Sequence, residues 1–268
     1  MISVARRAVR FRGLLATLTQ RELQARYRGS ALGFLWSLVN PLLLTGVYSL
    51  VFGWILAPGK GHVSIEPYAL FLISGLFPWL WASTALLEGT VSLAANAGLI
   101  RKAVFPVELP PLVSVFANLA HFLFALPILA IALAVGRGLG FPVGGWGALL
   151  LPLVVLLQLP MLAGAALALA SLNVLFKDVR DITTNLVTVL FFLAPIIYPL
   201  SAVSQPLVVK AVRLNPFTPF TEAYQAVLFF GVAPAPALWV HMAAVSFLIW
   251  AAGSWVFERL RSTLVEMS

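Results

Sequence analysis

Six long apolar stretches are the feature that most constrains how this chain can fold. Hydrophobic residues make up 61% of its 268 residues, charged residues only 10%, and the mean hydropathy is +1.00. Soluble proteins contain roughly a quarter charged residues, and no water-soluble core of this length could bury so much apolar surface. The sequence therefore predicts an all-α integral membrane protein, because a segment in lipid must satisfy its own backbone hydrogen bonds.

The length of each apolar stretch sets the number of membrane crossings. A bilayer core of about 30 Å needs roughly 20 apolar residues in helical form. By this measure the sequence predicts six transmembrane helices, at Trp36–Ala57, Tyr68–Leu87, Leu109–Val135, Trp146–Phe176, Asn185–Leu200 and Ala237–Phe257. The fourth is long enough to tilt, or to be broken near Pro152 and Pro160.

The domain organisation follows from what lies between these stretches. The sequence has no Pro/Ser linker, no low-complexity tract and no repeat of fixed period. Residues 1–268 are therefore predicted to form one membrane domain. Within it, residues 1–30 are a cytoplasmic or interfacial N-terminal segment, and residues 36–257 hold the six spans.

Basic residues predict the orientation, because cytoplasmic loops retain Lys and Arg. With the N-terminus inside, 13 of the 17 basic residues fall on the cytoplasmic side, and Lys60, Arg137, Lys210 and Arg213 fall outside. Both termini are therefore predicted to be cytoplasmic. The net charge of +8 and the pI near 10.5 match this bias toward an anionic inner leaflet and do not indicate nucleic-acid binding.

The sequence lacks the motifs of an enzyme or of an ion-driven carrier. It has no G-x-x-x-x-G-K-[ST] loop to cradle a nucleotide, no H-E-x-x-H pair, no G-x-S-x-G elbow and no cysteine. Its acids closest to the spans, Glu88 and Glu222, are expected at segment ends, whereas an ion-driven carrier needs a carboxylate or a broken-helix ion site within the membrane. We therefore expect no cofactor in this chain and an energy source in another subunit.

An amphipathic segment precedes the first span. Residues 13–29 alternate leucines with arginines and predict a helix lying on the inner leaflet. This helix is either an interfacial anchor or takes a direct part in function. Its polar and aromatic candidates are Arg21, Arg26, Tyr27 and Arg28.

A second polar segment, between the second and third spans, is too polar to cross the membrane and too long for a tight turn. Asn96 is expected to cap a short helix there, and Pro106 to end it. The helix would carry Leu99, Ile100, Arg101 and Lys102.

Four segments resemble one family of exporters when taken in order. They are RELQARYRGSALGFLWSLVNPLLL from Arg21, ANAGLIRKAVFPVELPPL from Ala95, LNVLFKDVRDI from Leu172 and LNPFTPFTEAYQAVLFFG from Leu214. Each motif alone is weak, but their order and spacing cover nearly the whole chain. Together they look like the permease subunit of type-2 ABC exporters, in the branch that exports O-antigen, capsular polysaccharide or teichoic acid.

This resemblance implies a function and a set of partners. The chain would be the channel-forming transmembrane subunit of an ATP-driven exporter in the bacterial inner membrane, and its cargo a polyprenyl-diphosphate-linked glycan. It would form a homodimer among membrane lipids, completed by two copies of a separate ATPase that binds ATP and Mg. The alternatives are a type-2 ABC exporter of drugs or lipids and, from another class, a membrane scaffold or an intramembrane enzyme. A neighbouring gene for an ATPase separates exporter from scaffold, and neighbouring glycosyltransferase genes separate glycan from drug.

The resemblance also implies where the ATPase docks. The loop after the second span, about 96–104, would form a coupling helix that fits a cleft of the ATPase. Arg101 and Lys102 would pair with acidic groups there and Leu99 and Ile100 would fill an apolar groove, although the two cations could also serve topology alone. The resemblance places a second contact with the ATPase in an internal segment whose charges alternate in sign. A local turn held by salt bridges would explain these charges equally well. The residues are Lys177, Asp178, Arg180 and Asp181.

The stretch between the last two spans, residues 201–236, is external in the predicted topology. It is apolar but interrupted by five prolines, which favours two half-helices that dip into the outer leaflet, and the resemblance supports this re-entrant hairpin near the channel exit. A plain periplasmic loop is the alternative. Glu222 and Arg213 are expected to pair there, beside Asn215, Pro216 and Pro219.

Aromatic residues suggest a path for sugars. The chain has 19 Phe, 8 Trp and 5 Tyr, and a cluster of them falls at Phe71, Phe77, Trp79 and Trp81. Sugar rings pack their C–H faces on aromatic planes, so these residues are candidates to line the polysaccharide path. An interfacial aromatic belt is the alternative.

Single cysteines test the predicted topology, since the chain has none of its own. In intact spheroplasts, Lys60→Cys is expected to react with a membrane-impermeant maleimide, because residue 60 is external. Arg259→Cys should react only after the inner face is exposed. The reverse order of labelling would overturn the orientation.

Overall fold

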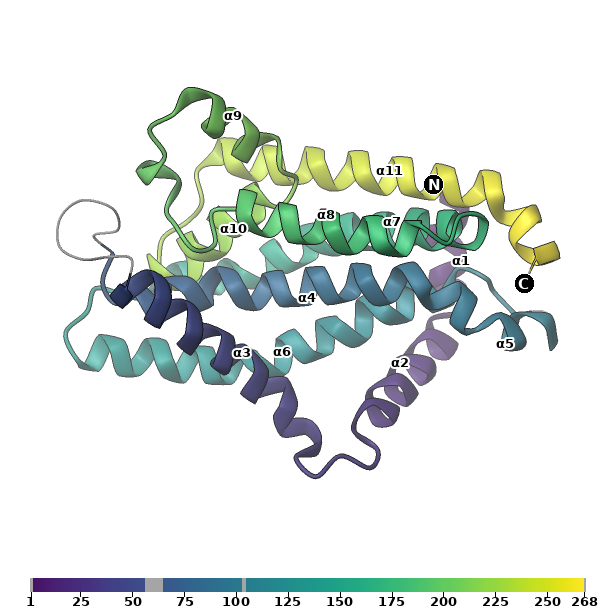
Figure 1. Cartoon of the computed structure of the whole chain (residues 1–268), viewed down its shortest axis with the longest axis horizontal. Helices are drawn as coiled ribbons and strands as arrows, with labels where there is room; N and C mark the ends of the chain where they lie inside the picture. The colour runs from purple at the N-terminus through teal and green to yellow at the C-terminus, as the bar shows by residue number, and fades with distance from the viewer. Residues whose placement is uncertain (1, 56–64, 103–104, 268) are drawn as a thin grey trace.

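The computed structural model describes residues 2–55, 65–102 and 105–267, and every regular element in them is a helix (Figure 1). The chain begins with α1 and α2, enters the membrane region with α3, and ends with the long α11. The helices are α1 (Ile2–Arg10), α2 (Arg12–Tyr27), α3 (Trp36–Tyr48), α4 (Tyr68–Ala95), α5 (Ala97–Lys102), α6 (Leu109–Gly138), α7 (Leu151–Leu175), α8 (Val179–Leu193), α9 (Pro206–Leu214), α10 (Thr218–Tyr224) and α11 (Pro236–Met267). Short 3-10 turns at 33–35, 146–150 and 200–202 and π-helical turns at 49–55 and 225–229 complete it.

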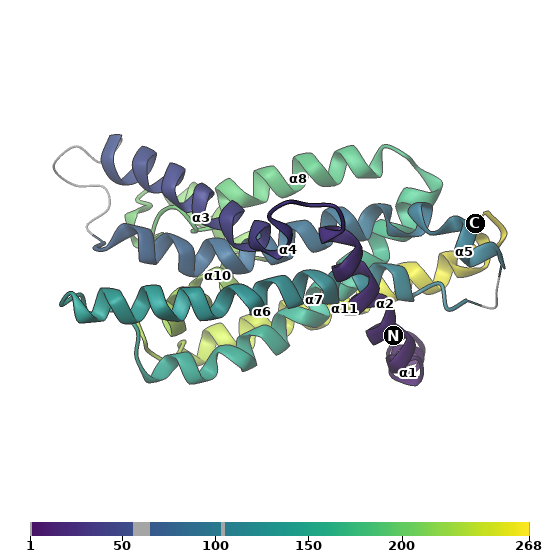
Figure 2. The same cartoon turned by 90° about the horizontal axis from the view of Figure 1, so that it is seen from below.

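Four helices are long and apolar enough to cross a membrane: Tyr68–Ala95, Leu109–Gly138, Trp146–Leu175 and Pro236–Leu264. The first of them, α4, is the centre of the bundle. In its most apolar window 78% of the residues are buried, against 28% in α6 and in α11. Figure 2 shows α3 and α8 along one side of α4, and α6, α7 and α11 along the other. The outer faces of α6 and α11 therefore remain apolar and exposed, as expected for helices that meet lipid.

The first and fifth predicted spans differ from the observed helices. The helix from Trp36 continues through a π-helical turn to Ile55, and its apolar part is Val39–Phe52. The fifth stretch was predicted at 185–200, but α8 runs over Val179–Leu193 and is only 15 residues long. Its end is set by Pro195, which keeps the preceding residue out of the helical conformation. It starts at Val179, before the predicted position, and Thr183 and Thr184 satisfy their hydroxyls by donating to carbonyls of their own helix at 2.7 and 3.0 Å. The four long spans are thus confirmed, and these two helices are too short to count by length alone.

Two other boundaries move outward from the predicted positions. Helix α4 continues eight residues past Leu87 to Ala95, and α11 continues ten residues past Phe257 to Met267. Glu88 directly follows the predicted apolar stretch, but it lies inside α4 and not at the end of the helix. These extensions carry charged side chains on otherwise apolar helices, next to the N-terminal segment.

Helices α7 and α11 approach each other closely at two glycines. A Cβ atom built on Gly253 would overlap the carbonyl group of Gly164, and one built on Gly164 would lie 2.6 Å from the carbonyl oxygen of Ile249. Small residues let membrane helices pack closely without a hydrophobic driving force between them. This crossing fixes α11 against the core.

Both termini lie at the same end of the bundle, together with α5 (Figure 1). The short helices α9 and α10 lie toward the other end. This placement agrees with an even number of crossings between the termini.

The N-terminal helix α1 is tied into that end of the bundle by one arginine. Arg7 Nε donates to Glu108 Oε1 at 2.7 Å, at the start of α6, and Arg7 Nη2 pairs with Glu258 of α11. The carboxylate of Glu108 is fully buried, and among the described residues its Oε2 has no hydrogen-bond partner. Desolvation lowers the pKa of the Arg7 guanidinium, but the hydrogen bonds to Glu258 and Glu108 outweigh it and the pKa is raised. Arg7 therefore stays charged and holds three segments together.

The Gly253→Ala variant tests the α7–α11 crossing. Its added methyl group has no room beside Gly164, and such overpacking costs roughly 1–3 kcal/mol. The melting temperature of the detergent-solubilised protein should fall. The matched control is Gly46→Ala in α3, where a Cβ meets nothing within 4 Å, and where alanine should be neutral or slightly stabilising. Equal melting temperatures for the two variants would contradict this packing.

The Arg7→Ala variant tests the tie of α1. Loss of this cation leaves the buried Glu108 without a counter-charge, which costs about 3–5 kcal/mol for a buried pair. Thermal unfolding should therefore occur at a markedly lower temperature than for Arg6→Ala, which removes an exposed arginine of the same helix. The double variant Arg7→Ala/Glu108→Gln should recover part of the loss. If Arg6→Ala and Arg7→Ala lowered the unfolding temperature equally, the ion pairs of Arg7 would not contribute to stability.

Candidate functional site: the α5 end and the aromatic cavity

The short helix predicted after the second span is present as α5. Its predicted cap differs in detail. Asn96 Nδ2 donates to the carbonyl of Ser92 at 2.8 Å, so the side chain caps the end of α4. The main-chain carbonyl of Asn96 accepts from the Ile100 amide at 3.1 Å and so begins α5. Asn96 is thus the joint between the central helix and α5.

Ile100 fixes α5 to the bundle. It is 6% exposed and packs in a cluster that includes Val4 of α1, Leu93 of α4 and Phe257 of α11. The expectation that Ile100 fills a groove of the partner is therefore wrong, because its side chain is buried against helices of its own chain. The side chains of Leu99, Arg101 and Lys102 lie outside the described part of the structure.

The second charged segment, at the turn between α7 and α8, lies next to α5. Lys177, Arg180 and Asp181 line a cavity of about 570 Å³ together with Ala95 and Ala97. Among the described residues the ion pairs involve Arg7 and Arg26 only, so the salt-bridge turn that was the alternative account of this segment does not form. Its charges, including Asp178, are exposed. The fold thus brings together the two segments for which a shared contact was predicted.

The predicted hairpin before the last span consists of α9 and of α10 with its π-helical continuation to Phe229. Asn215 organises its turn: the side-chain oxygen accepts from the Phe217 amide at 3.0 Å, and Nδ2 donates to the carbonyl of Leu190 in α8 at 2.8 Å. Gln225 adds a bond from Nε2 to the carbonyl of Pro195 at 2.8 Å. The second half of the hairpin is therefore locked inside the bundle.

The prolines and charges of the hairpin have separate roles. Pro216 follows Asn215 in the turn, and Pro219 lies in the first turn of α10, where its missing amide costs nothing. Arg213 is exposed on α9, whereas Glu222 is half-buried on α10. They form no direct ion pair among the described residues, although the charge of Arg213 acts on the Glu222 carboxyl group from a longer distance.

Two of the four aromatic candidates are packed in the core. Phe71 packs edge-on against Phe229 with ring centroids 5.6 Å apart. Trp79 lies between Phe191 of α8 and Phe217 of the hairpin, at 5.7 and 5.1 Å. These rings join α4 to its neighbours and line no described cavity.

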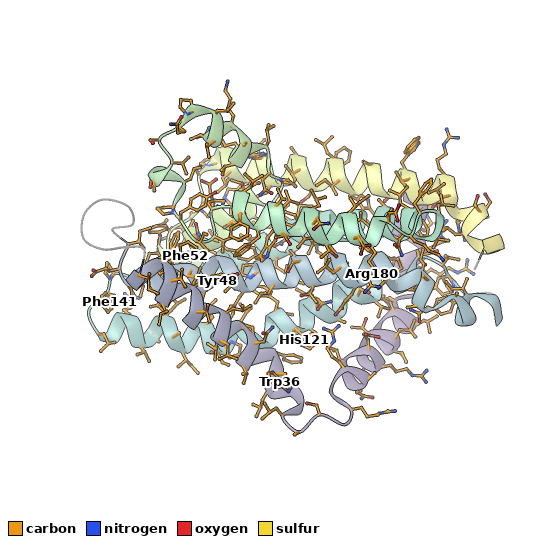
Figure 3. All side chains as sticks on the ribbon, in the orientation of Figure 1. Trp36, Tyr48, Phe52, His121, Phe141 and Arg180 are labelled. Carbon is orange, nitrogen blue, oxygen red and sulfur yellow. The ribbon has the colours of Figure 1, made fainter. Side chains whose placement is uncertain are left out.

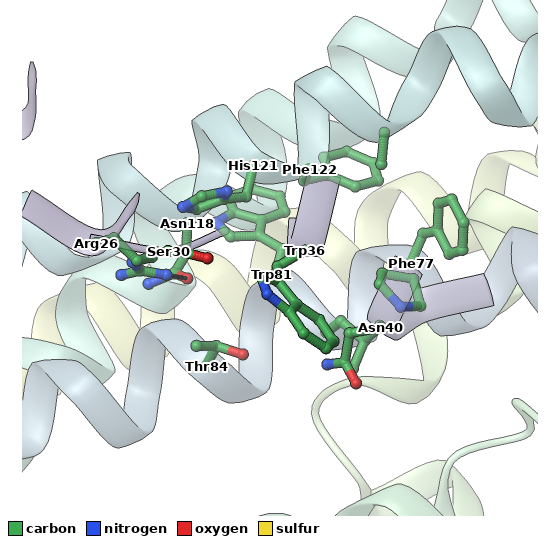
Figure 4. A pocket seen from close by; sticks show the side chains of 13 residues that line it. Arg26, Ser30, Trp36, Asn40, Phe77, Trp81, Thr84, Asn118, His121 and Phe122 are labelled. Carbon is green, nitrogen blue, oxygen red and sulfur yellow. Dashed lines mark hydrogen bonds between the residues drawn. The ribbon is translucent and has the colours of Figure 1, made fainter. Parts of the chain in front are cut away.

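A cavity of about 330 Å³ lies between α3, α4 and α6, and Trp36 and His121, both labelled in Figure 3, are among the residues that line it. The other two aromatic candidates, Phe77 and Trp81, line this cavity as well, and it is here called the aromatic cavity (Figure 4). Trp81 stacks on Phe122 at 5.5 Å and donates from Nε1 to the carbonyl of Val115 at 3.2 Å. The ring of Trp81 is therefore held in place by its own chain before any ligand arrives.

The other end of the aromatic cavity is polar. Figure 4 shows Arg26, Ser30, Asn118 and His121 gathered there. Arg26 pairs with Glu88 of α4 at 2.7 Å and donates to Asn118 Oδ1 at 3.1 Å. A cationic and amide-bearing end next to aromatic walls suits a ligand that carries both an anionic group and an apolar or sugar face.

The sequence predicted that Arg26 lies at the membrane interface, but in the structure its side chain points into the bundle. Arg21 and Arg28 are exposed on α2 and its end, while Arg26 turns into the bundle. The side chain of Tyr27 lies outside the described part. The chain then turns sharply between α2 and α3, where Gly29 and Gly33 have φ of +82° and +48°, a region that favours glycine. This turn directs Arg26 and Trp36 toward the same cavity.

Sequence reasoning missed Trp36, Asn118, His121 and the pair Arg7–Glu108. The sequence did indicate that the acids would be paired, because a carboxylate in or next to an apolar segment needs a cation near it. Nothing in the sequence indicated which arginine would meet which acid, because the paired residues lie 62 to 251 positions apart.

Comparison with known proteins places these observations in a family. The family described as ABC-2 type transporter matches residues 13–229. The O-antigen export system permease protein RfbA of Myxococcus xanthus is 37% identical over 269 residues, with 99% of each chain covered. Two permease proteins of the same name from Klebsiella pneumoniae are 34% and 33% identical, over 69% of this chain and 68% of theirs.

The family match contains the α2–α3 turn, the aromatic cavity, α5 and the hairpin, so every feature described above except α1 and α11 lies within it. With a relative at 37% identity over the whole chain, the similarity is not confined to apolar composition. This protein belongs to the ABC-2 type transporter family.

Proposed function

We propose that this protein is the transmembrane subunit of an ABC exporter that moves a lipid-diphosphate-linked polysaccharide of the O-antigen class across the bacterial inner membrane. The observation that carries this proposal is the similarity to the Myxococcus xanthus O-antigen export permease from end to end. The aromatic cavity and the four long apolar helices support it. ATP and Mg would be bound by a separate ATPase subunit, and the permease itself would catalyse no reaction.

The ATPase would dock at the end of the bundle that holds both termini. Helix α5 and the α7–α8 turn lie there on either side of a shared cavity. Since Ile100 anchors α5 to the clusters of α1 and α11, a push on α5 would be passed to those helices. Arg101 and Lys102 would meet acidic groups of the partner. This end would be cytoplasmic, in agreement with the distribution of basic residues.

Six crossings would result if α3 and α8 also span the membrane as short or tilted helices. Helix α3 with its π-helical continuation covers 36–55, which at 1.5 Å per residue approaches the thickness of a bilayer core of about 30 Å. Helix α8 would be completed by the buried segment 194–197. The hairpin of α9 and α10 would then re-enter from the outer side near the exit.

A second copy would cover α3 and α8. Both helices lie on the same side of α4, and both expose apolar faces, with Leu43 and Val47 on α3 and Val189 and Phe192 on α8 more than half exposed. The polysaccharide would pass between the two copies along these faces.

Reversing two charges on α5 tests the docking. In Arg101→Glu/Lys102→Glu, like charges would face the acidic cleft, a mismatch that costs several kcal/mol at an interface. We expect the variant to insert, because 11 of the 13 inside cations remain. Co-purification of the ATPase and export of polysaccharide should both fall at least about tenfold.

The matched control is Arg6→Glu/Arg10→Glu, which reverses two exposed charges of α1 at the same end of the bundle. This control should retain the partner. ATP hydrolysis by the permease purified without its partner would sink the assignment to an ABC permease. Normal export by the α5 variant would instead move the docking contact elsewhere.

A further inference from the structure

Arg26 lies in the wall between two cavities. One is the aromatic cavity of about 330 Å³. The other is a cleft of about 620 Å³ between α2, α4 and α6, here called the α2 cleft, which reaches Asn96 and Phe105 at the α5 end. Arg26 lines both spaces, while Glu88 lines only the α2 cleft and Asn118 only the aromatic cavity. The side chains around Arg26 therefore separate a space near the termini from a space in the middle of the bundle.

Three side chains from three helices close this wall. Arg26 Nη2 of α2 pairs with Glu88 Oε2 of α4 at 2.7 Å, and Arg26 Nη1 donates to Asn118 Oδ1 of α6 at 3.1 Å. Asn118 Nδ2 donates to the same Glu88 oxygen at 2.6 Å. One carboxylate oxygen therefore accepts from both donors, at a point that any oxyanion of similar size could occupy.

The carboxylate in this position can be exchanged. The side chains of Arg26 and Glu88 are 24% and 36% exposed, and ion pairs with such access to solvent are weak. Glu88 also faces the α2 cleft, where Arg21 offers a second cation. A guanidinium binds phosphate oxygens at least as well as a carboxylate, because its planar donors match their geometry.

Asn118 is a prepared donor. Its side chain is 3% exposed, and Nδ2 is also held by the carbonyl of Ser114 at 2.8 Å. This second bond keeps the amide pointing at the oxygen of Glu88 whether or not that oxygen is present. The site therefore needs little rearrangement when one acceptor replaces another.

We propose that Arg26 and Asn118 bind the diphosphate group of the cargo, which takes the place of Glu88 and so lies in the wall between the α2 cleft and the aromatic cavity. This inference rests on the proposed function and assigns the site of that function a ligand group. No bond is made or broken, since one anion replaces another on the same donors. The group attached to the diphosphate then lies against Trp36 and against Trp81, whose ring is already held by Phe122 and by the carbonyl of Val115.

The volumes agree with this assignment. Ligand cavities generally measure roughly 300–1,000 Å³, and both spaces fall in that range. The α2 cleft is the wider and more polar approach, as a charged group requires. The aromatic cavity has room for the residue next to the diphosphate and not for a polymer, so the rest of the chain lies elsewhere.

Binding of a short diphosphate ester to the permease–ATPase complex in phosphatidylcholine nanodiscs tests the proposal. The probe is farnesyl diphosphate, compared with farnesol and with inorganic diphosphate. Arg26→Gln should weaken binding of farnesyl diphosphate at least about tenfold, since a charge-assisted contact is lost. Glu88→Gln should tighten it several-fold, because the competing anion is removed. Farnesol should not compete.

The two substitutions of one ion pair are expected to change the affinity in opposite directions, and this distinguishes a binding role of the pair from a purely structural one. If the pair were only structural, Arg26→Gln and Glu88→Gln would weaken binding together, and the proposal would fall. The tighter binding expected of Glu88→Gln cannot come from a misfolded protein, so the test stands even if Arg26→Gln folds poorly. Arg12→Gln removes an exposed arginine of the same helix and should leave binding unchanged.

A second set of nanodiscs, with a different lipid composition, tests whether the bound phosphate group belongs to the cargo or to a membrane phospholipid. Nanodiscs that contain phosphatidylglycerol should leave binding of farnesyl diphosphate unchanged. Competition by phosphatidylglycerol at equal strength would assign the site to a membrane phospholipid and overturn the cargo assignment. Export by the wild-type complex is measured alongside: export without diphosphate binding removes this inference and keeps the proposed function, whereas a lack of export with the ATPase present removes the proposed function.

Discussion

Two arginines of the N-terminal segment neutralise carboxylates of the membrane bundle, and much of the structure depends on this compensation. Glu108 is fully buried at the start of α6 and meets Arg7, and Glu88 lies inside α4 and meets Arg26. An unpaired carboxylate is costly where it is fully buried, so Glu108 requires its cation, whereas the partly exposed Glu88 depends on its cation less. The helices α1 and α2 are therefore parts of the bundle and not only anchors on its surface.

The distinction between the two pairs is one of burial. Arg7 bridges two acids, one of them without access to solvent, and is suited to hold α1, α6 and α11 in a fixed relation. Arg26 and Glu88 are partly exposed and border two cavities. A pair with solvent access on one side can be exchanged for another anion at much smaller cost than a buried one. The same chemistry thus gives a fixed tie at one place and an exchangeable contact at the other.

The sequence predicted the features that depend on local composition. The all-helical membrane fold, four of the long spans, a short helix before Pro106 and a proline-broken hairpin all follow from apolar length and helix-breaking residues. The predictions from sequence were wrong for features that depend on tertiary contacts. Ile100 was expected to face a partner, but neighbouring helices bury it, and α8 begins before its predicted start, in a polar segment whose threonine hydroxyls are satisfied within the helix. The pairing of Arg26 with Glu88 could not be predicted, since it depends on how the turn at Gly29 and Gly33 sets α2 against α4.

Helix α4 connects the parts that the proposed export cycle would use. Along one continuous helix it carries Phe77 and Trp81 at the aromatic cavity, then Glu88 in the wall, and it ends at Asn96, where α5 begins. Pro78 lies near its middle, but no proline follows between Glu88 and Asn96, and the buried neighbours of this part leave little room for bending. In the proposed cycle, a displacement of α5 would therefore be transmitted to the position of Glu88 relative to Arg26. By linkage, replacement of Glu88 by another anion would then bias α5 by the same free energy with which α5 biases the replacement.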